Sequence, residues 1–183
     1  MIKRLFVAVP VSEEVRERIK VIYQQLKETG ADLNLVSLEN LHFTIKFLGE
    51  VEESKITEIA EKIKTFVNNH KPFSVKIKGI GAFSNENQIK VIWMGANDFQ
   101  LISLIKDFNK ELNYLRKNEQ KEIPHLTIAR VKSEKNKEKL SALIKKFADE
   151  NFGEMVVEKL ILYESKLTQA GPHYTLLSEW KLK

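Results

Sequence analysis

The sequence His-x-Thr-Ile occurs in two places far apart in the chain, and this repeat constrains the fold more than any other feature. Each copy lies in a run of alternating polar and apolar residues, the pattern of a half-buried β-strand. Residues two apart on a strand point to the same face, so His42 would lie beside Thr44 and His125 beside Thr127, with the intervening apolar residues in a core. We therefore expect two strands that each present an imidazole and a hydroxyl, facing one cleft.

The rest of the chain alternates between strand-like and helix-like patterns. Apolar residues at intervals of three and four predict helices that begin at Ser12, at Ser54, near Phe99 and at Ser133. Ser12 is the expected N-cap of the first helix, and Gly30 is expected to end it. The third helix is expected to reach Leu115. Strands are predicted at Lys3–Val9, Asn34–Val36, Leu41–Leu48, Phe73–Phe83, Gln88–Met94, His125–Val131, Met155–Glu164 and Tyr174–Leu182.

These elements occur in the same order in both halves of the chain: strand, helix, His-x-Thr strand, helix, strand. Duplication of this kind predicts an α+β fold with two lobes related by a pseudo-twofold axis, roughly residues 1–85 and 86–183, with intertwined termini. Each lobe would be an antiparallel-rich sheet backed by outer helices, with the cleft between the lobes. No linker rich in Pro, Gly or Ser separates the halves, so we expect one bilobal domain. The polar segment Arg116–Glu122 is expected to be a solvated loop.

Composition limits the classes of function. The chain has no cysteine, which excludes disulfides and thiolate metal sites. No apolar stretch approaches the roughly 20 residues needed to span a bilayer, and the N-terminus lacks the features of a signal peptide, so we expect a cytoplasmic protein. The net charge of +5 suits a polyanion such as RNA, but it equally suits the lysine- and glutamate-rich surface of a heat-adapted protein.

The chain resembles a known superfamily. The paired motifs, the opening Arg4–Val9, and the closing Leu160–Ser165 followed by Gly171–Tyr174 are similar to the two-histidine (2H) phosphoesterases. Within that superfamily they resemble the RNA 2′,3′-cyclic phosphodiesterases, also called 2′-5′ RNA ligase-like proteins. The resemblance implies opening of a terminal 2′,3′-cyclic phosphate to a 2′-phosphomonoester without metal or cofactor. Some members of the family ligate RNA through a 2′-5′ linkage. The expected partner is RNA with a cyclic phosphate end, such as a tRNA fragment, bound by a monomer.

The motif residues suit this chemistry, which needs one proton donor and one proton acceptor. An imidazole can serve as either near neutral pH. The resemblance implies that His42 protonates the leaving 3′-oxygen and that His125 activates water, although the symmetry of the motifs leaves the sequence itself silent on these roles. Thr44 and Thr127 would donate hydrogen bonds to the non-bridging phosphate oxygens.

The pattern offers further candidate residues outside the two motifs. Lys46 shares strand parity with Thr44 and could border the cleft, whereas Arg130 has the opposite parity and should leave it unless the strand bulges. His173 belongs to a third His-x-Thr outside the duplicated order and is expected to be structural or peripheral. His70 is expected to cap a helix or interact with its dipole. Candidates for base stacking are Phe83, Trp93 and Tyr174, each of which suits a place in the core at least as well, and Trp180 is expected in the core.

Two other functions remain open. A relative in the same superfamily could act on small cyclic nucleotide phosphates, and a module could bind RNA or a nucleotide in the cleft without turnover; retention of both histidines and both threonines disfavours the second. The sequence gives less support for a metal site than for these functions, because the nearby carboxylates Glu50, Glu52 and Glu53 follow the first motif strand without helical ligand spacing.

Overall fold

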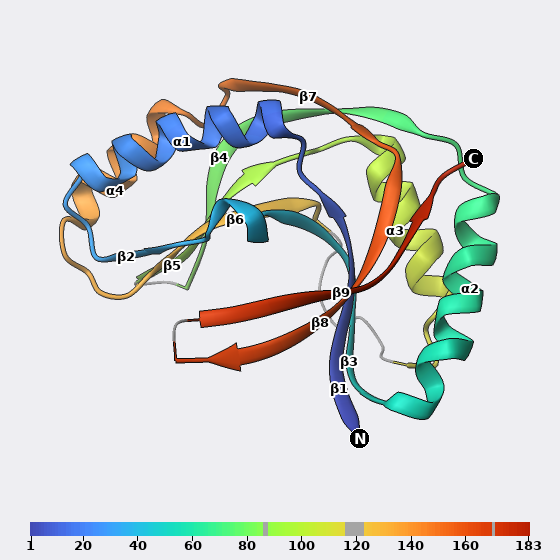
Figure 1. Ribbon diagram of the computed structural model, residues 1–183. Helices are drawn as coiled ribbons and strands as arrows, with labels where there is room; N and C mark the ends of the chain where they lie inside the picture. The colour runs from blue at the N-terminus through green and yellow to red at the C-terminus, as the bar shows by residue number, and fades with distance from the viewer. Residues whose placement is uncertain (86–87, 116–122, 170) are drawn as a thin grey trace.

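The strands of the described residues form one nine-stranded sheet flanked by helices (Figure 1). The computed structural model describes residues 1–85, 88–115, 123–169 and 171–183. Its strands are β1 (Ile2–Pro10), β2 (Leu33–Leu35), β3 (His42–Glu52), β4 (Phe73–Asn85), β5 (Gln88–Gly95), β6 (His125–Val131), β7 (Asn151–Val157), β8 (Lys159–Thr168) and β9 (Gly171–Lys181). Its α-helices are α1 (Glu13–Glu28), α2 (Ile56–Asn68), α3 (Phe99–Glu111) and α4 (Lys137–Lys146).

The strand order is symmetric about the two motif strands. The main path runs β7-β4-β5-β6-β3-β1-β8-β9, with four of its strands on each side of the boundary between β6 and β3, and β2 pairs with β6 as a further strand. Each motif strand pairs antiparallel with the strand that opens its own half of the chain, β3 with β1 and β6 with β5. In both lobes the next strand outward comes from the other half of the chain: β4 pairs with β5, and β8 pairs with β1. The two lobes therefore exchange segments, and the division of the chain near residue 85 stays a prediction.

Within the described residues, one bridge pair joins β3 to β6 and so connects the sheets of the two lobes. Phe43 on β3 lies opposite Leu126 on β6 in an antiparallel bridge, the middle residue of each His-x-Thr motif. Both side chains are buried in the core. The two expected sheets are thus joined into one at the pseudo-twofold axis, and the α+β class with antiparallel strands is confirmed.

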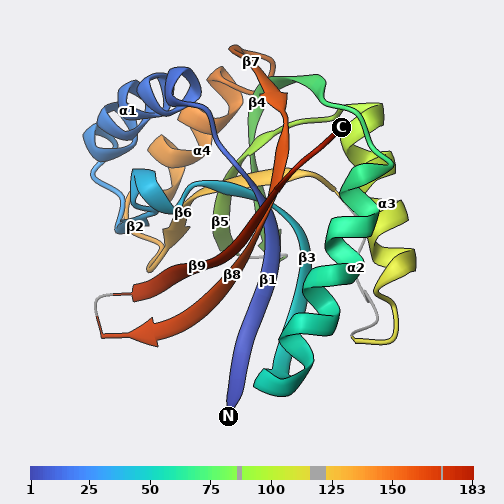
Figure 2. The ribbon, with the colours of Figure 1, turned by 45° about the vertical axis from the view of Figure 1, so that its right-hand side comes forward.

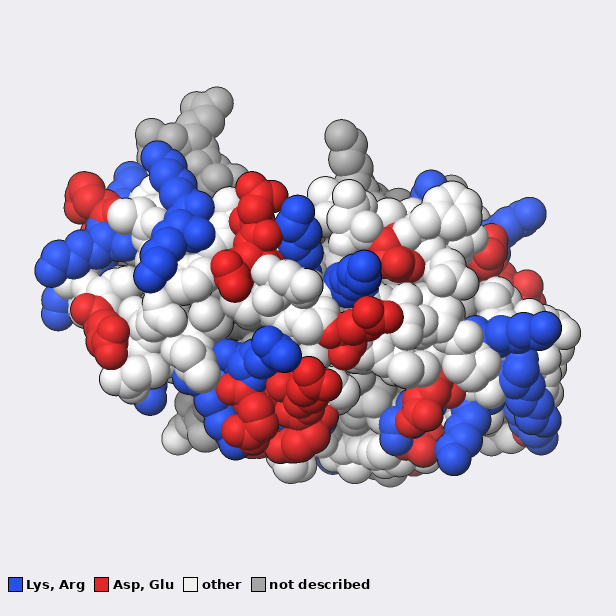
Figure 3. Space-filling model, turned by 90° about the horizontal axis from the view of Figure 1, so that it is seen from above, with Lys and Arg blue, Asp and Glu red and all other residues white. Residues whose placement is uncertain are grey.

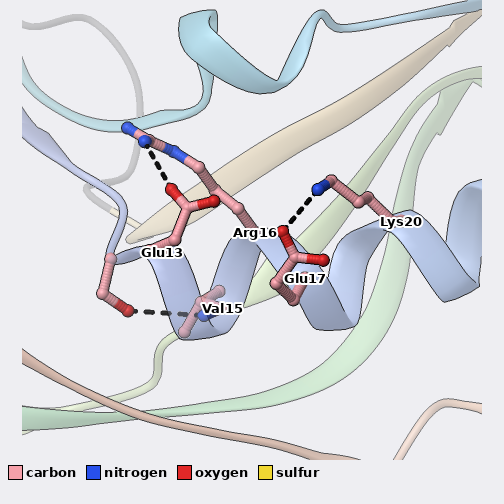
Figure 4. Close-up of polar contacts among 6 residues, drawn as sticks. Glu13, Val15, Arg16, Glu17 and Lys20 are labelled. Atoms are coloured by element: carbon pink, nitrogen blue, oxygen red, sulfur yellow. Dashed lines mark hydrogen bonds and ion pairs between the residues drawn. The ribbon is translucent and has the colours of Figure 1, made fainter.

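The helices cover the outer faces of the two lobes (Figure 2). The first pair, α1 and α4, contacts β7 and β4, while α2 contacts β8 and β9, and α3 contacts β3 and β4. As predicted, Ser12 caps α1, its hydroxyl accepting a hydrogen bond from the Val15 amide at 3.4 Å (Figure 4). Ion pairs join Glu13 to Arg16 and Glu17 to Lys20 along the exposed face of this helix.

Two predicted helix starts were wrong. Ser54 lies inside a short 3-10 turn, Glu53–Lys55, and α2 follows it with Lys55 at the N-cap and no side-chain cap. The fourth helix begins after Asn136, which adopts a left-handed backbone (φ 54°), and not at Ser133. The Asn136 side chain donates instead to the Gly30 carbonyl at 2.8 Å, so a tertiary contact fixes this turn.

The predicted strand Met155–Glu164 was also wrong, because it is two strands. The chain pairs with β4 up to Val157 and with β1 from Ile161 onward, so it passes from one lobe to the other between β7 and β8. Alternation alone cannot show such a change of partner. The third helix ends at Glu111, short of Leu115, and the predicted loop Arg116–Glu122 lies outside the described residues. None of the helices in the described part of the chain is long and apolar enough to cross a membrane.

Candidate active site

A cleft of about 1010 Å³ lies between the lobes and is lined by both motifs. His42 and Thr44 enter it from β3, and His125 and Thr127 enter it from β6, as the alternation predicted. The floor and rim come from β2 and the following turn, from Phe83 and Val91, and from the tip of the β8–β9 hairpin.

The bridge between Phe43 and Leu126 places these four side chains in one cluster. In an antiparallel pair the flanking residues run in opposite directions, so His42 lies toward Thr127 and His125 toward Thr44. All four lie on the cleft side, opposite the buried Phe43 and Leu126. The arrangement is a quartet in which each histidine has a threonine from its own strand and one from the partner strand beside it.

Both histidines are held in the same way. Nδ1 of His42 donates to the carbonyl oxygen of Asn40 at 2.7 Å, and Nδ1 of His125 donates to that of Ile123 at 2.7 Å. In each case the acceptor is two residues earlier in the chain. Because a carbonyl can only accept, the Nδ1 atom carries a proton in both rings, which leaves Nε2 to exchange protons with a ligand in the cleft.

His42 lies in the more enclosed half of the cleft. Its ring packs against Phe6 at a centroid distance of 4.9 Å and edge-on against Tyr174 at 5.4 Å. Burial lowers the pKa of His42, the hydrogen bond to Asn40 opposes this change, and the nearby charge of His125 lowers the pKa further.

His125 is supported by a different aromatic group. The Phe83 ring meets it edge-on at 4.8 Å, and Trp93 packs behind Phe83 at 5.4 Å. Of the three predicted stacking aromatics, Phe83 and Tyr174 line the cleft, while Trp93 does not belong to its lining. Trp180 packs against the core, as expected.

A bulge follows each motif and reverses the parity of the next residues. In β3 the pairing with β1 shifts after Thr44, so Lys46 turns into the core, where it is 2% exposed and donates to Asn109 Oδ1 at 2.9 Å. The suggestion that Lys46 borders the cleft was therefore wrong. In β6 the pairing with β5 shifts after Thr127, and Arg130 lines the cleft. Arg130 was expected to leave the cleft unless the strand bulges, and this exception applies, because the bulge adds one residue to the alternation.

The remaining histidines lie outside the quartet. His173 is exposed near the start of β9 and contributes to the cleft rim. His70 follows α2; its Nδ1 donates to the Phe66 carbonyl at 2.8 Å, which confirms the expected capping role. In the described part of the chain no group of three or more His, Cys, Asp or Glu side chains is placed to hold a metal ion. Glu53 pairs instead with Lys3 and with the N-terminal amine.

The sequence pattern missed several residues of the site. Asn40 and Ile123 act through backbone carbonyls, which no side-chain motif reveals. Phe6 and Phe47 belong to the site through strand pairing and the bulge. In the sequence, Phe47 is seen only as an aromatic residue three positions after Thr44, and Phe6 only as an aromatic residue in the first predicted strand.

Comparison with known proteins supports the family suggested by the motifs. The family model of LigT-like phosphoesterases matches residues 9–93 and 97–174. An RNA 2′,3′-cyclic phosphodiesterase of Methanocaldococcus jannaschii is 42% identical over 97% of this chain and 99% of its own. Another protein of the same name, from Thermotoga maritima, is 38% identical over 96% and 94% of the two chains.

Solved structures show the same fold. The Thermus thermophilus protein TT0787 is 26% identical, with a TM-score of 0.83 over 98% of this chain and 97% of that one. LigT of Escherichia coli in complex with 3′-AMP is 23% identical, with a TM-score of 0.72 over 99% and 98% of the chains. At that identity the second likeness concerns the fold alone.

Proposed function

Because the chain belongs to the LigT-like phosphoesterase family, we propose that it hydrolyses RNA 2′,3′-cyclic phosphate ends to 2′-phosphomonoesters. The observation that carries the proposal is the matched pair of imidazoles, each with Nδ1 bonded to a backbone carbonyl and each lining the same cleft. Full-length relatives named RNA 2′,3′-cyclic phosphodiesterase agree with it.

The reaction needs only groups that the quartet offers. A neutral histidine takes a proton from water at Nε2 while the water oxygen bonds to phosphorus. The bond from phosphorus to the 3′-oxygen breaks, and the second histidine, protonated, donates its Nε2 proton to that oxygen. Both imidazoles return to their starting states by proton exchange with solvent, so no metal is required.

The threonines complete the site. Negative charge grows on the non-bridging oxygens as phosphorus becomes five-coordinate, and hydroxyls already directed at the phosphate stabilise it without reorganisation. Thr44 and Thr127 occupy equivalent places in the quartet, one on each side of the bridge. Each would serve one non-bridging oxygen.

The two histidines differ in their surroundings, which bears on their roles. The resemblance to the family makes His42 the proton donor and His125 the base. Burial lowers the pKa of His42 and thereby favours its neutral imidazole. For His42 to act as the acid, the negative charge of the bound phosphate must raise its pKa again.

The hydrolytic activity is tested with RNA that bears a 2′,3′-cyclic end. Wild type should give a 2′-phosphate, with activity that survives EDTA, and His42→Ala and His125→Ala should each lose most of the rate. His173→Ala, at the rim, should stay within a few-fold of wild type. The proposal is wrong if the two motif variants retain near-wild-type rates or if only the His173 variant is inactive. A parallel assay with cyclic mononucleotides separates RNA from small nucleotides as substrate.

The role of each histidine is tested with a substrate whose 3′-bridging oxygen is replaced by sulfur. A thiolate leaves without protonation, so loss of the general acid is rescued and loss of the base is not. His42→Ala should therefore cleave the sulfur substrate much faster than the oxygen substrate, relative to wild type. Rescue of His125→Ala instead would reverse the assignment.

Ligation would use the same site. If the 5′-hydroxyl of a second RNA replaces water as the attacking group, the same proton transfers give a 2′-5′ linkage. Incubation of cyclic-ended RNA with 5′-hydroxyl RNA, followed by product sizing, measures this activity beside hydrolysis.

A further inference from the structure

The two carbonyls that hold the histidines are themselves supported in different ways. The acceptor of His42 is Asn40 and that of His125 is Ile123, each at 2.7 Å from Nδ1. Pro124 follows Ile123, and a residue before proline is disfavoured in the helical region, which limits the direction of its carbonyl. The residue after Asn40 is a leucine, which imposes no such limit. The direction of the Asn40 carbonyl therefore depends on other contacts.

The turn that carries Asn40 is short. Asn40 ends the 3-10 turn Leu38–Asn40, in which its amide donates to the Ser37 carbonyl at 2.9 Å. The turn has no side-chain cap, and none of its three residues is buried. Because hydrogen bonds in a 3-10 turn have poor geometry, this turn alone holds its last carbonyl weakly.

A hydrogen bond from the Asn40 side chain joins this turn to a distant part of the chain. Nδ2 of Asn40 donates to the Pro172 carbonyl at 3.3 Å, over a sequence separation of 132 residues. Pro172 lies at the start of β9, in the β8–β9 hairpin that projects from the sheet in Figures 1 and 2. Beside it, the Thr168 hydroxyl donates to the Gly171 carbonyl at 2.7 Å. The acceptor of the Asn40 amide therefore lies next to a hydrogen-bonded end of the hairpin.

The same hairpin also contacts the His42 ring directly. Tyr174, two residues after Pro172, meets the imidazole edge-on at a centroid distance of 5.4 Å. The hairpin thus contacts His42 at the ring and, through Asn40, at the carbonyl that holds Nδ1. His125 packs instead against Phe83 on β4.

We propose that Asn40 is a positioning residue for catalysis, because its side chain ties the β8–β9 hairpin to the carbonyl that holds Nδ1 of His42. The inference rests on the proposed function. It makes the orientation of His42, and not that of His125, depend on where the hairpin lies. When the protonated His42 gives its Nε2 proton to the leaving oxygen, the neutral ring keeps its proton on Nδ1, and the Asn40 carbonyl accepts a hydrogen bond from it. Asn40 itself transfers no proton.

The first consequence can be measured without substrate. A neutral imidazole carries its proton on either nitrogen, and the acceptor beside Nδ1 selects the Nδ1–H form. In Asn40→Ala the carbonyl is less firmly held, so part of the His42 population should change to the Nε2–H form. The ¹⁵N chemical shifts of the ring nitrogens, recorded at alkaline pH on histidine-labelled protein, report this change. The tautomer of His125 should stay as in wild type.

The second consequence is kinetic. Asn40→Ala should lower kcat by about tenfold and leave KM within about twofold, because a misoriented imidazole affects the transition state more than ground-state binding. In a His42→Ala background the same change should alter the rate by less than about twofold, since two changes that act through one group are not additive. A further tenfold loss in that background, or an unchanged His42 tautomer in Asn40→Ala, overturns the proposal.

The matched control is Asn69→Ala. Nδ2 of Asn69 also donates to a backbone carbonyl, that of Thr65 at 3.2 Å, but it does so at the exposed end of α2, outside the cleft lining. This variant should keep wild-type rates and tautomers. If Asn40→Ala shows no cooperative thermal transition, Asn40→Ser replaces it, because its side chain is too short to reach the Pro172 carbonyl.

The proposed function is tested separately by hydrolysis with the wild-type protein. If wild type does not hydrolyse cyclic-ended RNA, the proposed function fails, while the tautomer measurement still tests the tie between Asn40 and His42.

Discussion

His42 illustrates how one residue connects burial with pH. Its pKa lies below the ordinary histidine value near 6.5 because burial disfavours the charged ring. Below about pH 6.5 the unfolded chain therefore binds more protons at this residue than the folded protein does, so its contribution to stability is present above that pH and is lost as the pH falls toward the lowered pKa.

Urea unfolding at a series of pH values from about 7.5 to about 5 measures this contribution of His42 to stability. The free energy of unfolding of wild type should decline more steeply with falling pH than that of His42→Gln, which has no group to titrate here. Parallel curves for the two proteins would mean that His42 has an unperturbed pKa.

The threonines are tested without disturbing the fold. Thr44→Val and Thr127→Val keep the branched shape that suits a strand and remove only the hydroxyl. Each should lower kcat by about tenfold to a thousandfold with little change in KM, because the lost hydrogen bond forms fully only in the transition state. Thermal unfolding is the control for folding. A large rise in KM at constant kcat would assign the hydroxyls to ground-state binding instead.

At the scale of an element, β4 supports His125 through a glycine. A Cβ at Gly81 would lie 2.3 Å from the Trp93 ring, and Trp93 packs on Phe83, which packs on His125. Gly81→Ala should therefore displace the indole and, through Phe83, the imidazole. We expect lower kcat together with a changed Trp93 fluorescence spectrum, measured in a Trp180→Phe background. An unaltered kcat despite a shifted spectrum would show that the aromatic stack does not position His125.

The bulge in β3 has its own anchor in the core. Lys46 and Asn109 are both buried and hydrogen-bonded to each other. Lys46→Leu leaves the Asn109 carbonyl oxygen without this donor and should cost about 1–3 kcal/mol in urea unfolding. Lys46→Leu/Asn109→Leu should recover part of that loss, because an apolar pair needs no hydrogen bond. A double variant that is no more stable than Lys46→Leu would contradict this account.

At the scale of the whole molecule, the duplicated order of elements predicted a cleft between two lobes with His42 and His125 facing it. Alternation along a strand carries that information, since it reports which residues share a face. It could not predict Arg130 or Phe47, because one added residue in a bulge reverses parity and leaves no local sequence signal. Nor could it predict that β7 and β8 are separate strands, since a change of pairing partner is a tertiary event.

The net charge of +5 is also a property of the whole molecule, and the structure indicates where the basic side chains lie relative to the acidic ones and to the cleft. Many basic side chains pair with carboxylates three or four residues away on the helices, such as Arg18 with Glu14 and Lys62 with Glu58. Blue and red side chains are interspersed on the face shown in Figure 3. Among the described residues that line the cleft, histidines aside, the charged side chains are Arg130 and Glu39. On the face shown in Figure 3, basic side chains are thus interspersed with acidic ones, and Arg130 is the one Lys or Arg among the described residues that line the cleft.

This distribution predicts a weak dependence of catalysis on salt. Each contact between a cation and a phosphate of single-stranded RNA contributes a slope of about −0.7 to a plot of log affinity against log salt concentration. With Arg130 as the fixed cation of the cleft, kcat/KM on a cyclic-ended oligonucleotide should fall with a slope of about −0.7 to −1.4. Arg130→Gln should flatten the slope by about 0.7, whereas Lys62→Gln, on an exposed helix, should not change it. A slope of about −3 or steeper would show instead that lysines outside the cleft contact the RNA phosphates, so that the basic excess of the chain contributes to substrate binding.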